Sequence, residues 1–433
     1  GNGRWESTSF NSRLQPTQIA LGTVQGGTDK LKLDFTYNAP GLNNNNGNVL
    51  SQTITVPTEV RNNITYNGFT ANQAYIYDSL NRIEQATETV SGQTGNNWQQ
   101  TFDYDRYGNR TFDELNTTTL PKNCVNGNQQ AIVCANMVAQ VNPSANTGNN
   151  RLNGYSFDNS GNTILDAQSR KFTYDGENKQ VKVETVDANG NPVNTIGIYE
   201  YDGDGRRVKK ISATEITVFV YNASGQLVAD YSTNIEPAQT ARVSYLTSDH
   251  LGSPRITTDR DGKVFSRRDF MPFGEEITAA QTPQRSINQN YGEDGIRQKF
   301  TSYERDFETE LDFAQARMYS SKLGRFASSD PVFLTIERIR DPQRLQLYVY
   351  SRNNPLKFID PDGKDVVISG SDEGKARKKY EVILKGLKSK DRKKVSFFVG
   401  EGKDGYKTGE FYVLVDKDHK SKSENFNALQ SAA

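Results

Sequence analysis

The stretch YDGDGRR, residues 201–207, is the clearest copy of a short unit that recurs along this chain. The unit begins with an aromatic residue and an Asp or Asn, and after a short variable part it continues with Gly or Asn. Further copies are YDSLNR from Tyr77, YDRYGNR from Tyr104, FDNSGN from Phe157, YDGEN from Tyr174, YNASGQ from Tyr221 and the related DRDGKV from Asp259. A recurring unit of this kind indicates a repeat architecture.

The chemistry of the unit is that of a β-hairpin. An Asp or Asn at the start of a turn accepts hydrogen bonds from the backbone just ahead of it. Gly or Asn then supplies the positive φ that closes a short loop. Segments between the turns, such as ITVFVY at residues 216–221, alternate apolar and polar residues, which is typical of strands with one buried face.

One hairpin is too thin to bury its apolar face alone, so neighbouring hairpins must pair edge to edge. We therefore predict a mainly β protein, a long curled antiparallel sheet forming the wall of a shell. The rings of Tyr104, Tyr174 and Tyr201 are expected to be buried, and very little helix is expected before Asp365. The alternative is a β-sandwich or propeller, although propeller blades run nearer 40 residues. The basic pairs Arg206-Arg207 and Lys209-Lys210 are expected to form a solvated face.

Composition agrees with a thin, folded sheet. Only 34% of the 433 residues are hydrophobic and the mean hydropathy is −0.76, yet 10% are aromatic. Disordered chains are poor in aromatic residues, so disorder is disfavoured.

Charge is balanced overall but uneven along the chain. The net charge is +0, which gives no general attraction to nucleic acid or anionic membranes. Residues after Asp365 carry about five surplus positive charges, which marks them as a separate unit. No apolar run is long enough to span a bilayer, and we expect an export signal upstream of this stretch.

Cysteine and histidine are too scarce for a zinc site, and YDGDGR lacks the distant Glu of a calcium loop. No metal and no cofactor are therefore predicted. Cys124 and Cys134 flank a loop-like stretch that interrupts the repeats. A disulfide between them in a secreted protein and two free thiols are both open.

From Tyr245 onward several longer motifs follow one another in order. They are YLTSDHLGSPRITTDRDG from Tyr245, FMPFGEE from Phe270, RQKFTSYERDFETELDFAQARMY from Arg297, LGRFASSDP from Leu323 and QLYVYSRNNPLKFIDPDG from Gln346. With the upstream repeats, they resemble the YD-repeat (Rhs-repeat) family with its Rhs-associated core. That family includes bacterial polymorphic toxins, toxin-complex C subunits and, more distantly, teneurins.

The resemblance implies a hollow β-shell whose core segment plugs one end and whose variable C-terminal segment is held inside as cargo. It divides the chain into a repeat region at 1–240, a core at 241–365 and a tail at 366–433. Partners would be the tail itself, upstream shell segments and copies of the chain.

The resemblance also implies a single-turnover, aspartyl-type autoprotease in the core. Motif by motif, its residues fall on Arg317, Asp330 and Asp360, and the bond to be cut lies between Lys364 and Asp365. The chain departs from the family pattern at Lys364, where an apolar residue is usual, and at Ser320, where Asp is usual. The alternative is an inert core in which both Asp-Pro pairs only start turns. His250 lies in a hairpin motif and is expected to be structural.

The tail reads as a β-α-β-β unit, with strands at 366–368, 395–399 and 411–415 and a helix at 373–387. Its surplus of Lys would suit a nucleic-acid-directed toxin using Glu401, Asp416 and His419, and a non-toxic tail is the alternative.

Two functions follow for the whole chain. The first is a secreted or cell-surface bacterial shell that houses and releases a toxin-like effector in interbacterial competition or host interaction. The second is a structural or adhesive surface protein without enzymatic activity, which self-assembles through open sheet edges.

Overall fold

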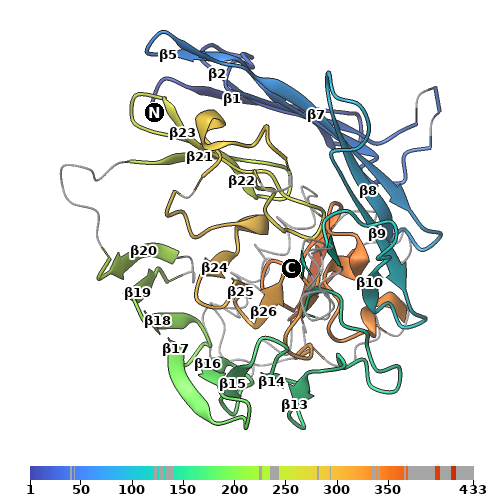
Figure 1. The fold of residues 1–433 in the computed structure, drawn as a ribbon, viewed down its shortest axis with the longest axis vertical. Helices are drawn as coiled ribbons and strands as arrows, with labels where there is room; N and C mark the ends of the chain where they lie inside the picture. Colours follow the sequence, from blue (N-terminus) through green and yellow to red (C-terminus); the bar gives the residue numbers. More distant parts are fainter. Residues whose placement is uncertain are drawn as a thin grey trace.

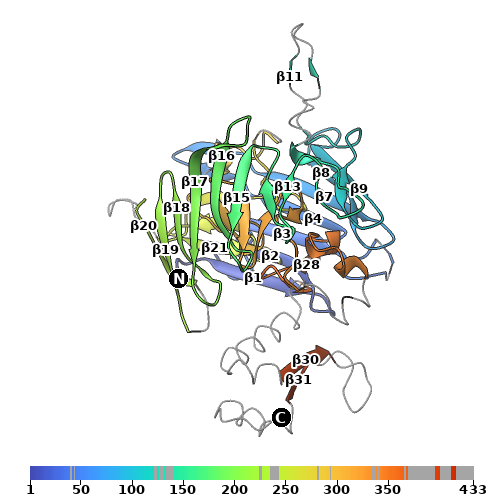
Figure 2. The same cartoon turned by 90° about the horizontal axis from the view of Figure 1, so that it is seen from below.

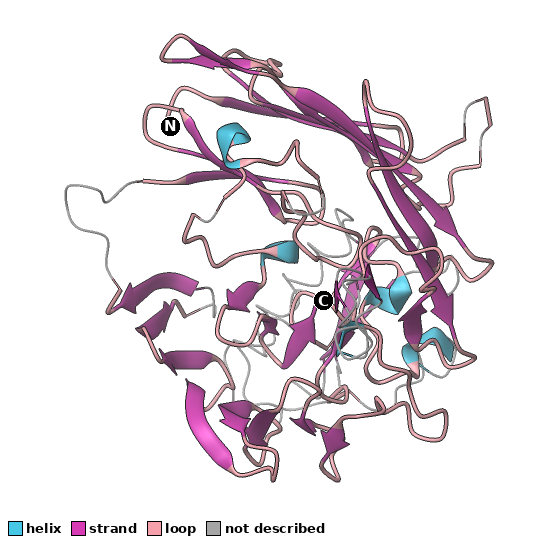
Figure 3. Ribbon diagram, viewed as in Figure 1, coloured by secondary structure: helices cyan, strands magenta, loops and turns pink. Residues whose placement is uncertain are grey.

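The computed structural model describes residues 1–39, 41–42, 44–120, 124–125, 131–132, 140–223, 227–234, 243–279, 282–292, 294–332, 338, 342–364, 367–368, 395–399 and 411–415. Within them the protein is mainly β, and every strand pair is antiparallel (Figures 1 and 3). Helical structure in these described residues is limited to short segments. Among these are the 3-10 turns η1 (Ile287–Gln289), η2 (Phe300–Ser302), η3 (Pro342–Arg344) and η4 (Ser351–Asn353). The predicted fold class is confirmed.

Two eight-stranded sheets are built from consecutive hairpins. The first has the order β1 (Trp5–Phe10), β2 (Pro16–Gly22), β3 (Leu31–Thr36), β4 (Ser51–Val56), β7 (Phe69–Tyr77), β8 (Ile83–Val90), β9 (Trp98–Tyr104), β10 (Arg110–Phe112). A small hairpin of β5 (Glu59–Arg61) and β6 (Ile64–Tyr66) lies between β4 and β7 in the sequence. The second sheet has the order β13 (Ser156–Phe157), β14 (Thr163–Leu165), β15 (Arg170–Tyr174), β16 (Gln180–Val186), β17 (Pro192–Tyr201), β18 (Arg207–Ser212), β19 (Ile216–Tyr221), β20 (Leu227–Ser232).

The segment after the second sheet runs between the two sheets (Figure 1). It forms one sheet of β21 (Tyr245–Ser248), β22 (Pro254–Thr258) and β23 (Val264–Arg267), and another of β24 (Glu304–Asp306), β25 (Leu311–Ala314), β26 (Arg317–Ser320) and β27 (Arg325–Phe326). Apolar residues of this segment pack into the buried clusters of both large sheets. Phe273 and Tyr350 belong to the same buried cluster as the first sheet, and Met318 to the cluster of the second.

The repeat turns have the predicted geometry. In the turn at Asp202, the carboxylate Oδ1 accepts the backbone N–H of Asp204 at 3.0 Å and of Arg206 at 2.9 Å, and Gly205 has φ +74°. The same pair of bonds recurs at Asp78, Asp105, Asp175, Asp249 and Asp259. The left-handed position is held there by Asn81, Gly108, Asn178, Gly252 and Gly262. Repeats and core therefore share one turn design.

The repeat tyrosines pack inward. Tyr104 packs against the first buried cluster, and Tyr174 and Tyr201 against the second, while each residue as a whole is half-buried. The Tyr104 hydroxyl donates to the Ile83 carbonyl at 2.5 Å, and that of Tyr201 to the Gln180 carbonyl at 2.8 Å. The prediction for these rings is confirmed, and the hydroxyl groups of Tyr104 and Tyr201 tie their hairpins to the preceding strand.

The prediction of a solvated basic face is wrong for two of its four residues. Arg207 and Lys210 are 1% and 2% exposed. Arg207 pairs with Asp306 at 2.6 Å, and Lys210 lies 3.2 Å from the same carboxylate. The core segment supplies the acidic residue that neutralises them, and a local strand pattern carries no information about that distant residue.

The cysteine segment and the tail are described only in part. Strands β11 (Cys124–Val125) and β12 (Ala131–Ile132) pair with each other, and β11 projects away from both large sheets (Figure 2), as expected for an excursion. In the tail, β29 (Val367–Ile368), β30 (Val395–Val399) and β31 (Phe411–Val415) confirm the three predicted strands. The predicted helix at 373–387 lies outside the described residues. No helix in the described part of the chain is long and apolar enough to cross a membrane.

Candidate active site

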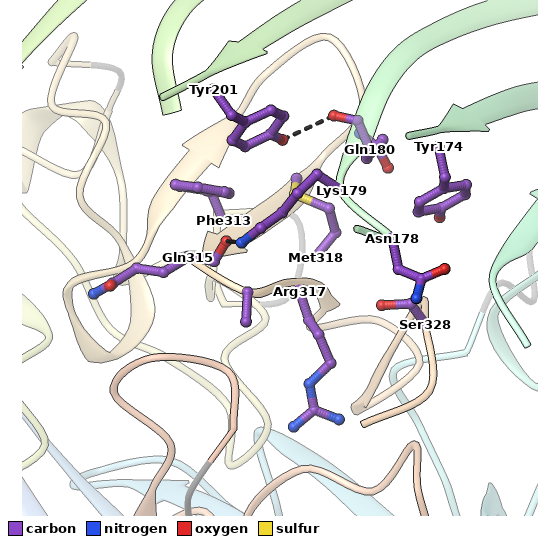
Figure 4. Close-up of a pocket in the computed structure, with 11 residues that line it drawn as sticks. Tyr174, Asn178, Lys179, Gln180, Tyr201, Phe313, Gln315, Arg317, Met318 and Ser328 are labelled. Atoms are coloured by element: carbon purple, nitrogen blue, oxygen red, sulfur yellow. Dashed lines mark hydrogen bonds between the residues drawn. The ribbon is translucent and has the colours of Figure 1, made fainter. Parts of the chain in front are cut away.

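Arg317 opens strand β26 and is almost completely buried. Its guanidinium stacks on the ring of Phe326 at 3.6 Å and donates from Nη1 to the Leu347 carbonyl at 3.0 Å. Figure 4 shows the guanidinium pointing away from Lys179 and Tyr201, which lie on the side of the second sheet. The Arg317 side chain therefore points away from the second sheet and toward the end of the core segment.

Both predicted aspartates meet at one atom of Arg317. Its Nη2 lies 3.2 Å from Oδ2 of Asp330 and 3.1 Å from Oδ2 of Asp360. The two carboxylate oxygens are therefore at most 6.3 Å apart, the sum of those distances. The structure thus brings all three predicted residues together, although 43 positions separate Arg317 from Asp360.

The two carboxylates have different surroundings. Asp330 also binds Arg338 Nη2 at 2.6 Å, and its Oδ1 accepts the backbone N–H of Val332 at 2.8 Å. Asp360 is 1% exposed, and burial raises its pKa to about 6, an effect that Arg317 only partly offsets. Asp330 is thus held between two guanidinium groups, whereas Asp360 is the carboxyl that takes up a proton near neutral pH.

The predicted cleavage position lies against this cluster. The backbone N–H of Lys364 donates to Asp360 Oδ1 at 2.9 Å, and the Lys364 carbonyl accepts from Arg338 Nη2 at 3.1 Å. Arg317 Nε donates to the Gly363 carbonyl at 2.5 Å. Lys364 itself is exposed, and Asp365 lies outside the described residues.

A tight turn fixes this geometry. Strand β28 (Phe358–Ile359) pairs with β29, and the described residues 360–364 form the turn that follows β28. Gly363 has φ +72°, and a Cβ there would lie 2.4 Å from the Ala314 carbonyl oxygen. Only glycine fits at that point, because the turn packs directly against the end of strand β25.

Arg338 was not foreseen from the sequence. It lies in the stretch VFLTIERIRDPQRLQ between the two aspartates, which carries no recognisable motif. The signal available was a basic residue between the two aspartates, and three arginines in this stretch fit that description.

Among the other predicted residues, His250 lies in the described part of the chain and does not join this cluster. His250 is half-buried and packs against Phe35, with ring centroids 4.6 Å apart, and its Nε2 lies 2.9 Å from the Leu356 carbonyl oxygen. Burial lowers the His250 pKa, which favours the neutral imidazole. His250 is therefore a structural residue that joins the first sheet to the core segment. Cys134, Glu401, Asp416 and His419 lie outside the described residues, so the disulfide and the tail site stay predictions.

Comparison with known proteins gives distant similarities. No family model matches the chain. The chain is 24% identical over 306 residues to the tRNA nuclease WapA of Bacillus subtilis strain 168, which covers 69% of this chain and 11% of WapA. It is 24% identical over 243 residues to the double-stranded DNA deaminase toxin A of Burkholderia cenocepacia strain H111, covering 45% of this chain and 15% of that toxin. It is 34% identical over 122 residues to salivary gland surface protein 1 of Aedes aegypti, covering 28% and 3%.

Solved structures give a similar result. The Tc holotoxin pore of Photorhabdus luminescens contains a chain with TM-score 0.49 and 17% identity, covering 84% of this chain and 18% of that one. A chain of TcdB2–TccC3 without its hypervariable C-terminal region gives TM-score 0.47 and 16% identity, covering 83% and 17%. This chain therefore spans about a tenth of the full length of WapA. It is similar to segments of much larger toxin and surface proteins.

Proposed function

We propose that this chain is the wall and core of a secreted or cell-surface bacterial shell, which houses a C-terminal effector and releases it by cutting its own backbone after Lys364. One observation carries the proposal: buried Arg317 holds Asp330 and Asp360 together beside the Lys364 peptide group. The similarity to WapA and to deaminase toxin A, both named as enzymes or toxins, supports an effector as the cargo.

The chemistry would divide between the two carboxyl groups. Asp330, paired with two arginines, would accept the proton of a water that attacks the Lys364 carbonyl carbon. Arg338 would stabilise the negative charge that develops on the Lys364 oxygen, because it already donates to that atom. Protonated Asp360 would donate its proton to the nitrogen of Asp365 as the carbon–nitrogen bond breaks. The products are a carboxyl group on Lys364 and an amine on Asp365.

The hairpin around this bond would make release easy. In the described residues, two residue pairs, Phe358 with Ile368 and Ile359 with Val367, join β28 to β29. A strand pair this short is not stable by itself. A cut at Lys364 would therefore leave the tail attached by a contact that opens readily.

The test is whether the tail separates and whether Asp360 is required. Purified protein is followed on a denaturing gel and by intact mass, with Asp360→Asn and the matched control Asp175→Asn, an exposed turn aspartate. We expect a tail fragment beginning at Asp365 from the wild type and the control, and an intact chain from Asp360→Asn. An intact wild-type chain over days would overturn the proposal.

A second candidate is a structural surface protein that associates through its sheets. Strand β20 ends its sheet, and Val228 and Tyr231 on it are 59% and 66% exposed, next to Val218 on β19 at 42%. Exposed apolar edge strands are templates for pairing with another chain. Sedimentation velocity separates the two functions, because this candidate requires concentration-dependent association of uncut chains, which Val228→Lys should abolish.

A further inference from the structure

The turn at residues 360–364 is bound along its whole backbone. Each of its five carbonyl oxygens accepts a hydrogen bond from a group outside the turn. Loops normally run over the surface of a protein, so an unbroken row of bound carbonyls is unusual for a turn. We call the five donors the carbonyl clamp. In the order of the carbonyls they are the hydroxyl of Tyr303, Nε2 of Gln315 at 3.4 Å, the backbone N–H of Ala316 at 3.1 Å, Nε of Arg317 at 2.5 Å and Nη2 of Arg338 at 3.1 Å.

The side chains of the same turn are held less closely. Lys364, the residue before the proposed cut, is exposed, and Pro361 and Asp362 are half-buried. Main-chain hydrogen bonds give a bound peptide its affinity, whereas pockets for its side chains give selectivity. Apart from the buried Asp360 carboxyl group, the contacts that hold this turn are therefore mainly of the first kind.

Tyr303 holds the first carbonyl of the turn. Its side chain is 5% exposed, packs beside Tyr319, and donates its hydroxyl to the Asp360 carbonyl 57 positions away. The Asp360 side chain meanwhile pairs with Arg317. The main chain and the side chain of the proposed acid are therefore fixed by two different parts of the core.

We propose that the carbonyl clamp selects the bond to be cut by its place along the backbone, with Tyr303 as a positioning residue and without reading the Lys364 side chain. This inference rests on the proposed cleavage after Lys364. Holding a reacting group in its productive geometry supplies much of the rate of an intramolecular reaction. The clamp provides that geometry, because the four bound carbonyls before Lys364 fix the position of the Lys364 carbonyl beside Asp330 and Asp360.

Two neutral replacements of Lys364 test the selectivity. Leu and Gln differ in shape and polarity, but neither adds a charge beside the two carboxyl groups. Lys364→Leu and Lys364→Gln should both release a fragment that begins at Asp365, at rates within about threefold of each other, because backbone contacts do not discriminate between side chains. Intact mass identifies the fragment, and gel densitometry gives the rates. A fragment that begins elsewhere, or rates that differ by more than about tenfold, as a side-chain pocket produces, overturns the proposal.

Tyr303→Phe tests the clamp itself, and Tyr319→Phe is its matched control. Both tyrosines are buried, and the Tyr319 hydroxyl donates to a backbone carbonyl outside the turn, that of Phe273, at 2.7 Å. Tyr303→Phe should cut about tenfold more slowly, the factor that one lost hydrogen bond is worth, while Tyr319→Phe stays close to the wild-type rate. An equal loss of rate in both variants would assign Tyr303 to packing alone and overturn its positioning role.

Hydrogen exchange separates this inference from the proposed function. The peptide 358–364 stays with the core whether or not the chain is cut, so the exchange of its amides reports on the clamp in either case. Tyr303→Phe should speed this exchange, including that of the Lys364 N–H that bonds to Asp360, whereas Tyr319→Phe should not. An uncut wild type that shows this difference refutes the cleavage and supports the clamp. Unchanged exchange in Tyr303→Phe overturns the clamp even where the wild type cuts.

Discussion

Arg285 and Glu88 face each other in a fully buried, two-pronged ion pair. Nη1 and Nη2 of Arg285 each donate to one carboxylate oxygen of Glu88 at 2.7 Å, across 197 positions of sequence. The pair joins the core segment to strand β8, and Arg285 continues to Asp269 at 2.7 Å. The core is therefore attached to the first sheet by charge as well as by apolar packing.

Replacing Glu88 with Ala should destabilise the fold strongly. The change leaves Arg285 buried with one carboxylate fewer, and breaking a buried pair from one side costs about 3–5 kcal/mol. Denaturant unfolding of Glu88→Ala measures that loss. Glu84→Ala, on the exposed face of the same strand, is the control and should change the free energy of unfolding by less than about 0.5 kcal/mol.

The repeat turn at residues 201–207 offers a second comparison within a single loop. Gly205 has φ +74°, so Gly205→Ala should cost about 1–2 kcal/mol, and Gly205→Asn should cost less because Asn81 and Asn178 hold the equivalent position. A Cβ atom added at Gly203 would have no neighbour within 4 Å, and Gly203 has no positive φ. Gly203→Ala should therefore be neutral or slightly stabilising. Equal effects at the two glycines, in thermal or denaturant unfolding, would contradict this assignment of the turn.

These two cases show why the sequence predicts one part of the fold better than another. The turn at Asp202 depends on residues within five positions, and hydrogen bonding and φ preference act locally, so the motif predicts the geometry. The partner of Glu88 lies in a loop 197 positions away, and strand periodicity contains no information about it. Arg207 and Lys210 are buried rather than solvated for the same reason, because their acidic partner Asp306 is distant in the sequence.

The candidate site divides in the same way. Arg317, Asp330 and Asp360 lie in motifs that resemble a known core, and the resemblance placed them together. Arg338 lies in a stretch without a motif, and only the folded chain brings its guanidinium to Asp330 and to the Lys364 carbonyl. Likewise, the difference between the two carboxyl groups depends on burial, which the motifs do not specify.

The rate of self-cleavage should fall as the pH rises. In the proposed mechanism Asp360 acts as the acid, so the active form is the protonated one, and its pKa of about 6 sets the midpoint. Above pH 6 the rate should fall about tenfold per pH unit, and below pH 6 it should level off. Gel densitometry from pH 4.5 to 8 measures the profile, and a rate that rises through pH 6 would assign Asp360 as the base instead.

The last prediction concerns Arg338, the residue that only the structure identified. Its Nη2 lies 2.6 Å from Asp330 Oδ2 and 3.1 Å from the Lys364 carbonyl oxygen, so one group touches both the base and the bond to be cut. Removing a donor of this kind typically slows acyl chemistry by about 10²–10³-fold. We therefore expect Arg338→Ala to cut that much more slowly, while Arg106→Ala, at an exposed arginine, cuts at the wild-type rate. Because Arg317 still holds both carboxylates in Arg338→Ala, the variant should fold, and its melting temperature reports on this. Added guanidinium should partly restore cutting by Arg338→Ala but not by Asp360→Asn, since only the first variant lacks a cation. A wild-type cleavage rate in folded Arg338→Ala would show that Arg338 only positions the turn and takes no part in polarising the carbonyl.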